Sequence, residues 1–177
     1  MNELREKAKK IKLFLCDVDG VLTDAGMYYG EAGEESKKFC TLDGGGFILL
    51  KMAGIQTGLI TSEKTALVAR RAGKLRLDWV IQGAKNKKKE FHRLLARTGI
   101  AARETAYIGD DINDMEMLAE AGISASVPGH CLPPEFSIDY VTGRRGGEGA
   151  VRDFAEWLLR MRGEYEKALA LYLESLP

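Results

Sequence analysis

Short apolar runs alternate with longer segments of helical periodicity along most of this chain. The first run, residues 13–16, is apolar at every position and ends at an acidic turn, which is typical of a strand buried on both faces. Similar runs occur at residues 57–60, 79–81, 105–108 and 123–127, and helical patterns lie between them at residues 46–52, 65–75, 87–97 and 113–121. This alternation predicts right-handed βαβ units, and therefore an α/β fold with an open, doubly wound (Rossmann-like) parallel sheet.

The length and charge of the chain indicate how many domains it has and which kinds of partner it lacks. With 177 residues the chain has the size of one domain, so we expect a single domain over residues 1–177. Its 26 basic and 26 acidic residues balance, which gives no electrostatic reason to expect nucleic acid or an anionic membrane as a partner. Residues 1–12 are polar and charged, and no later stretch approaches the roughly 18 apolar residues of a membrane span. We therefore expect neither a signal peptide nor a transmembrane segment.

Two segments depart from the alternation. Residues 27–29 and 36–39 flank a glycine-containing turn, which predicts a β-hairpin. This flap, about residues 25–42, follows the acidic turn directly, so we expect it to overhang a site there. Near the C-terminus, apolar residues recur at helical spacing in residues 151–161 and 164–176, which predicts a helical tail over about residues 151–177.

Polar residues follow the apolar runs at the point where each predicted strand ends. These residues are Asp17 and Asp19, then Thr61 and Ser62, then Asp110, Asp111 and Asp114. Ligands of open parallel sheets bind beyond the carboxyl ends of the strands, so we expect these side chains to line one crevice.

Several carboxylates in one crevice repel each other, and a hard cation is the expected remedy. Mg²⁺ takes about six oxygen ligands and keeps several waters, which suits one or two carboxylates together with a phosphate oxygen. A hydroxyl from Thr61 and the ammonium of Lys87 would bind the remaining phosphate oxygens. The pattern therefore indicates magnesium-assisted phosphate chemistry.

Each motif also has a purely structural interpretation. The run from Asp17 to Gly20 could be a simple turn, and Asp110 with Asp111 could cap the following helix. Thr61 could be a helix N-cap, and Lys87 lies in a basic run of a kind that is usually solvated. Only the combination, in this order and with every member at a strand end, favours a catalytic site.

In that combination the chain resembles the haloacid dehalogenase superfamily of phosphatases. The superfamily pattern of DxDG, a Thr or Ser, a Lys and GDDxxD is met at residues 17–20, Thr61, Lys87 and residues 109–114. The resemblance implies that Asp17 is the nucleophile and that Asp19 is the general acid and base. It also implies that Mg²⁺ is bound by Asp17, Asp19 and Asp110, and the phosphoryl group by Thr61, Ser62 and Lys87. Asp111 and Asp114 would hold these ligands in position without binding the magnesium ion directly.

The segments between the motifs leave no room for a cap domain. Among capless members, the sequences of residues 17–24, 42–44 and 145–152 are similar to those of the 3-deoxy-D-manno-octulosonate 8-phosphate (KDO 8-phosphate) phosphatases. This similarity implies a sugar-acid phosphate as substrate and a homotetramer in which a neighbouring subunit closes each site.

The chain departs from the usual pattern of that family after Thr61, where Ser62-Glu63 replaces Gly-Arg. Glu63, together with Arg71 and Lys74, resembles the related phosphatases that act on 2-keto-3-deoxynononate (KDN) 9-phosphate. These three residues are therefore candidates for substrate binding, with the carboxylate of the sugar acid paired to Arg71 or Lys74. The alternative is that Glu63 faces solvent at the start of a helix.

Other functions fit the sequence less well. A phosphoacceptor receiver domain lacks both the second aspartate at the position of Asp19 and the late GDDxxD motif. A non-catalytic oligomerisation module of sugar-nucleotide biosynthesis would be expected to lose acidic ligands, which are all present here. Three scattered cysteines, Cys16, Cys40 and Cys131, form no disulfide framework, so we expect a cytoplasmic protein.

Overall fold

A parallel sheet organises the molecule, as the sequence predicts. The structure, a computed structural model, describes residues 2–176. Strands pair in the order β5-β4-β1-β6-β7-β8, and every neighbouring pair is parallel. Their bounds are β1 Leu13–Cys16, β4 Gln56–Ile60, β5 Trp79–Ile81, β6 Thr105–Ile108, β7 Ile123–Ser126 and β8 Tyr140–Val141. The chain winds outward from β1 in both directions, which confirms the doubly wound fold.

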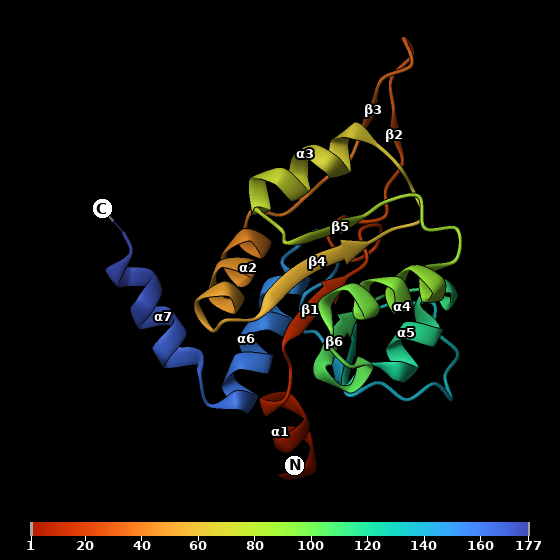
Figure 1. The fold of residues 1–177 in the computed structure, drawn as a ribbon. Helices are drawn as coiled ribbons and strands as arrows, with labels where there is room; N and C mark the ends of the chain where they lie inside the picture. Colours follow the sequence, from red (N-terminus) through yellow and green to blue (C-terminus); the bar gives the residue numbers. More distant parts are fainter. Residues whose placement is uncertain (1, 177) are drawn as a thin grey trace.

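Helices cover both faces of the sheet (Figure 1). One face carries α2 (Leu42–Met52), α3 (Ala66–Leu75) and α6 (Ala150–Arg162), and the other carries α4 (Lys87–Thr98) and α5 (Met115–Glu120). The outer helices α1 (Asn2–Lys9) and α7 (Tyr165–Glu174) pack on α6 and α2, and the short 3₁₀ helices η1 (Ala102–Glu104) and η2 (Ile112–Asp114) flank β6.

The central strand β1 is buried on both faces, as its apolar sequence predicts. Phe14 packs with Phe47 of α2 and Phe154 of α6, with ring centroids 6.0 Å and 5.2 Å away. On the other face, Leu15 belongs to the cluster that contains Phe91 of α4. Because α6 contributes to this core, residues 150–162 are a structural layer of the domain rather than a tail.

The predicted hairpin is present with shorter strands, β2 (Tyr28–Tyr29) and β3 (Glu35–Ser36), paired antiparallel. It projects beyond the sheet (Figure 1), and a bridge between Thr23 and Phe39 closes its base. Within residues 2–176, no helix combines the length and apolar character needed to cross a membrane.

Three elements differ from the sequence prediction. Helix α2 begins at Leu42 rather than at residue 46, because three glycines at positions 44–46 hide the helical pattern. Helix α1 and strand β8 were not predicted, since α1 is polar and β8 has only two residues. Tertiary contacts stabilise α1: Arg162 of α6 donates hydrogen bonds to the carbonyls of Ala8 and Ile11, at 3.0 Å and 2.7 Å.

Candidate active site

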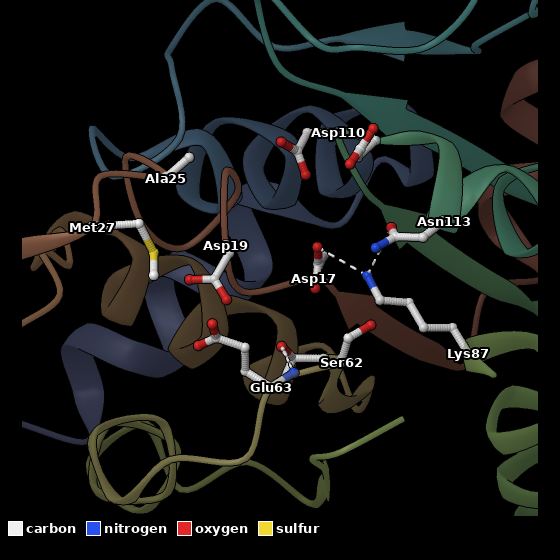
Figure 2. A pocket seen from close by; sticks show the side chains of 11 residues that line it. Asp17, Asp19, Ala25, Met27, Ser62, Glu63, Lys87, Asp110 and Asn113 are labelled. Carbon is white, nitrogen blue, oxygen red and sulfur yellow. Dashed lines mark hydrogen bonds and ion pairs between the residues drawn. The ribbon is translucent and has the colours of Figure 1, made fainter. Parts of the chain in front are cut away.

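Six of the seven polar residues predicted after β1, β4 and β6 line one pocket, and the seventh, Asp114, is buried and does not line it. Cys16, the last residue of β1, lies opposite Leu59 and Ile108 in the neighbouring strands, so the residues that follow emerge side by side. The pocket has a volume of about 290 Å³ and is shown in Figure 2. Its lining residues come from the strand ends, α4, η2 and the base of the hairpin: Asp17, Asp19, Ala25, Met27, Thr61, Ser62, Glu63, Lys87, Asp110, Asp111 and Asn113.

Lys87 lies at the centre of the buried part of the site. Its ammonium group lies 3.0 Å from a carboxylate oxygen of Asp17 and 2.8 Å from one of Asp114, and its side chain is 3% exposed. It also donates a hydrogen bond to Asn113 Oδ1 at 3.2 Å (Figure 2). The interpretation of Lys87 as a solvated residue at a helix start is therefore wrong, because α4 begins at this residue and directs its side chain into the pocket.

Asp114 is buried and fully engaged by hydrogen bonds. The Tyr107 hydroxyl donates to its Oδ1 at 2.6 Å, and the backbone N–H groups of Asp110 and Asp111 point to its Oδ2 at 3.2 Å and 3.4 Å. With Lys87 added, both of its oxygens have partners. Asp114 is therefore placed to hold the loop after β6 and the lysine in position.

Asp17 and Asp110 form the part of the site that suits a cation. One oxygen from each of Asp17, Asp110 and Asp114 lies within 4.8 Å of the others, and Oδ1 of Asp110 is buried without a hydrogen-bond partner among the described residues. Burial, reinforced by the charge of Asp114, raises the pKa of Asp17. Burial and the neighbouring carboxylates of Asp114 and Asp111 raise the pKa of Asp110 to about 7. A divalent cation would relieve this repulsion and bind the free oxygen.

Glycine is required where the loop after β1 passes Asp110. Gly20 has a φ of +85°, and a Cβ atom at this position would collide with the Asp110 carboxylate. Gly146 has a similar role, because a Cβ there would collide with the Gly20 carbonyl. The glycine at position 146, in the segment 145–152, therefore allows this second backbone segment to pack against the loop that carries Asp19.

Asp19 lies at the outer edge of the pocket and has a different environment from Asp17. Its side chain is 34% exposed, and its Oδ1 lies 2.6 Å from the ammonium of Lys37. The Thr23 hydroxyl donates a weak hydrogen bond to the same oxygen at 3.4 Å. Lys37 also forms an ion pair with Glu63 at 2.8 Å. Burial alone would lower the pKa of Lys37, but its bonds to Asp19 and Glu63 raise the pKa overall.

The two hydroxyl residues after β4 line the pocket. Thr61 is almost fully buried, and its Oγ1 accepts a hydrogen bond from the Glu63 backbone at 3.3 Å. Thr61 is not a helix cap, because Thr65 caps α3 by accepting a hydrogen bond from Val68 N. The structural interpretation does hold for Asp111, whose carboxylate accepts from Ile112 N at 2.7 Å at the start of η2.

The candidate substrate residues do not all lie together. Glu63 lines the pocket, whereas Arg71 and Lys74 line a separate groove of about 330 Å³ between the hairpin and α3. We call this the basic groove; its lining residues are Lys37, Phe39, Leu67, Arg70, Arg71 and Lys74. Arg71 Nη2 donates to the Cys40 carbonyl at 2.6 Å, so its guanidinium faces the segment between the hairpin and α2.

Sequence reasoning missed Lys37, Asn113 and the two hairpin residues Ala25 and Met27. Asn113 occupies a variable position of the GDDxxD pattern, and its neighbours in that motif were a signal for it. Nothing in the local sequence distinguishes Lys37 from Lys38, although their side chains are 2% and 50% exposed in the folded protein.

Comparisons with known proteins agree with this geometry. A family model for haloacid dehalogenase-like hydrolases matches residues 46–122. The chain is 36% identical over 172 residues to the 3-deoxy-D-manno-octulosonate 8-phosphate phosphatase of Yersinia pestis, covering 96% of this chain and 91% of the relative. The phosphatase of the same name from Escherichia coli K12 is 39% identical over 164 residues, covering 92% and 86%.

Solved structures of phosphatases are similar to this chain over nearly its whole length. The 3-deoxy-D-manno-octulosonate 8-phosphate phosphatase of Moraxella catarrhalis, in complex with magnesium, phosphate and KDO, superposes with a TM-score of 0.91 at 40% identity, covering 97% of this chain and 99% of that one. The cobalt-bound phosphatase of Haemophilus influenzae has a TM-score of 0.85 at 31% identity and covers 93% and 99%.

Proposed function

We propose that this chain, which belongs to the haloacid dehalogenase-like hydrolases, is a magnesium-dependent phosphatase that acts on 3-deoxy-D-manno-octulosonate 8-phosphate. One observation carries the proposal most directly. A buried carboxylate, Asp17, lies at the end of the central strand against Lys87, and close by lies an oxygen of Asp110 that has no hydrogen-bond partner within residues 2–176. The names of the similar phosphatases support the choice of substrate.

In the proposed reaction, Asp17 and Asp19 divide the work. A carboxylate oxygen of Asp17 bonds to phosphorus while the bond from phosphorus to the leaving oxygen breaks, and Asp19 gives its proton to the departing alcohol. Asp19 then takes a proton from water, whose oxygen bonds to phosphorus as the bond to Asp17 breaks. The products are the sugar acid and inorganic phosphate, and Asp17 is regenerated.

The remaining residues of the pocket bind charge. Thr61, Ser62 and Lys87 would hold the phosphoryl oxygens. The carboxylates of Asp17 and Asp110 and the backbone carbonyl of Asp19 would hold Mg²⁺, with Asp111 and Asp114 supporting them from behind. Bound magnesium supplies positive charge that neutralises the phosphoryl group. The buried oxygen of Asp110, which has no partner in the described part of the chain, fits this role.

The far end of the substrate would extend from the pocket toward the basic groove. The substrate carries a phosphate at one end and a carboxylate at the other, and Arg71 and Lys74 offer two cations for the carboxylate. Glu63 would accept hydrogen bonds from sugar hydroxyls. This division predicts that Glu63 and Lys74 together set the preference between eight-carbon and nine-carbon substrates.

We also propose a homotetramer in the cytoplasm. Met27, Tyr28 and Tyr29 of the hairpin are 55%, 46% and 69% exposed, an apolar surface suited to contact with a second copy. Three free cysteines suit a reducing compartment. Light scattering tests the assembly, and a stable, fully active monomer would refute it.

A phosphate-release panel tests the substrate. With Mg²⁺ present, we expect KDO 8-phosphate to be hydrolysed with a higher kcat/KM than KDN 9-phosphate or simple sugar phosphates. A preference for KDN 9-phosphate would favour the alternative substrate that Glu63 suggests. If none of the monoesters releases phosphate, the chain is a non-catalytic module and the proposed function is wrong.

A further inference from the structure

Lys37 has a buried side chain in a hairpin that is mostly exposed or half-buried. It directly follows Ser36, the last residue of β3, and its side chain is 2% exposed, whereas that of the adjacent Lys38 is 50% exposed. A buried ammonium group is costly unless charged partners surround it. Its two partners, at 2.6 Å and 2.8 Å, are the carboxylates of Asp19 and Glu63.

These carboxylates come from different parts of the chain. Asp19 belongs to the loop after β1, and Glu63 belongs to the loop after β4. Figure 2 shows the two side chains turned toward each other across the pocket. Two like charges in this arrangement repel, so the cation between them decides where each carboxylate rests.

Lys37 also lies at the boundary between two cavities. Its partners Asp19 and Glu63 line the active-site pocket, and Lys37 itself lines the basic groove beside Arg71 and Lys74. A substrate that extends from one cavity into the other passes this lysine. Lys37 thus connects the hairpin to the acid–base residue, in addition to the weak hydrogen bond from Thr23 at the base of the hairpin.

We propose that Lys37 is a positioning residue, which holds the Asp19 carboxylate toward the leaving oxygen and makes that position depend on the hairpin. The inference rests on the proposed phosphatase reaction, but not on the identity of the natural substrate. Lys37 does not touch the phosphorus or the attacking oxygen, and it acts through Asp19.

Two simple phosphate esters can show whether a variant of Lys37 misplaces the general acid or loses structure more generally. The p-nitrophenolate of p-nitrophenyl phosphate leaves readily without a proton, whereas the phenolate of phenyl phosphate depends more on general-acid help. For Lys37→Met we expect kcat/KM on phenyl phosphate to fall at least about tenfold, while kcat/KM on p-nitrophenyl phosphate falls less than about threefold. The ratio kcat/KM reports the steps up to departure of the alcohol and not the later attack of water, in which Asp19 serves both esters alike. An equal loss on both esters, or no loss on either, would overturn the proposal.

Two further variants complete the test. Lys38→Met removes the neighbouring charge, whose nearest partners are 3.7 Å and 4.0 Å away, and should leave the ratio of the two kcat/KM values unchanged. Lys37→Arg keeps a cation and should bring the ratio back toward that of the wild type, even if Lys37→Met folds poorly. A ratio in Lys37→Arg as altered as in Lys37→Met would exclude the ion pairs as the cause. Neither ester carries a sugar acid, so failure of KDO 8-phosphate as substrate would be seen separately.

Discussion

Two lysines, one on each side of the site, each lie between two carboxylates that would otherwise repel one another, but the two pairs of carboxylates differ in burial. Lys87 bridges Asp17 and Asp114, whose side chains are 7% and 0% exposed, and Lys37 bridges Asp19 and Glu63, which are 34% and 39% exposed. Lys87 begins a helix of the main layers, while Lys37 belongs to a hairpin outside the sheet. The buried side is suited to hold the phosphoryl group, and the open side is suited to vary with the substrate.

The difference in burial has a direct energetic consequence. An ion pair in the interior is hard to break, because the remaining partner keeps its charge without solvent. An exposed partner regains water when the pair is lost, so the cost is small. The two sides should therefore differ in what their removal does to folding as well as to catalysis.

The largest effect is expected from Asp17→Asn, which removes the proposed nucleophile on the buried side. Phosphate release should fall by at least about 10⁴-fold, because an amide cannot form the covalent intermediate. The fold should persist, since Lys87 keeps its bond to Asp114. Phosphate release at saturating Mg²⁺, together with a thermal unfolding curve, checks both statements. Turnover near that of the wild type would contradict the assignment.

The comparison of the two lysines is tested by Lys87→Met and Lys37→Met. We expect Lys87→Met to lower the free energy of unfolding by about 3–5 kcal/mol, because it leaves buried carboxylates unpaired. Lys37→Met should cost less than Lys87→Met, because the side chains of Asp19 and Glu63 are 34% and 39% exposed, even though the Glu63 oxygen beside Lys37 is buried. Urea unfolding of both variants without Mg²⁺ gives the values. Equal costs would remove the energetic distinction between the two sides.

Alanine variants of Gly20 and Gly33 distinguish the effect of a steric clash from the effect of a left-handed backbone. Gly20 and Gly33 have φ values of +85° and +90°, but only at Gly20 does a carboxylate occupy the space of a Cβ atom. At Gly33, no heavy atom of the other described residues, its chain neighbours aside, lies within 4 Å of that position. Both alanine variants should lose about 1–3 kcal/mol of stability from the left-handed backbone. Only Gly20→Ala should also weaken Mg²⁺ binding, measured by calorimetry, because it displaces Asp110. Similar Mg²⁺ affinity in both variants would contradict the crowding argument.

The smallest expected effect is a pH dependence of stability and of Mg²⁺ affinity that comes from Asp110 on the buried side of the site. The pKa of Asp110 rises from 3.8 to about 7 in the metal-free protein, so the folded state binds a proton more tightly than the unfolded chain. Stability from this group is present below the unfolded value and is lost as the pH rises toward 7. Mg²⁺ needs the ionised carboxylate, so its affinity should rise over the same interval.

Thermal unfolding at pH 5 and pH 8 measures this linkage. The increase in Tm on addition of Mg²⁺ should be larger at pH 8 for the wild type. Asp110→Asn has no proton to lose at this position, so the difference between the two pH values should shrink. An identical difference in the variant would exclude Asp110 as its source.

Local patterns in the sequence were sufficient for most of the fold and for the chemical part of the site. Residues 13–16, apolar throughout, predict a strand buried on both faces, and the acidic residues after it predict the pocket. Both depend on periodicity and on the rule that strand ends of a parallel sheet meet at one edge. Elements without such a pattern, the polar helix α1 and the two-residue strand β8, could not be found in this way.

The sequence by itself determined that Asp17, Thr61, Lys87 and Asp110 would meet, because each follows or begins an element whose position the sheet prescribes. Only the tertiary structure decided that Lys37 turns inward while Lys38 does not, and that Arg71 and Lys74 line a groove separate from the pocket. These positions depend on how the hairpin packs against α3 and the loop of Asp19. Contacts between segments far apart in the chain have no local signature, so their outcome appears only in the folded molecule.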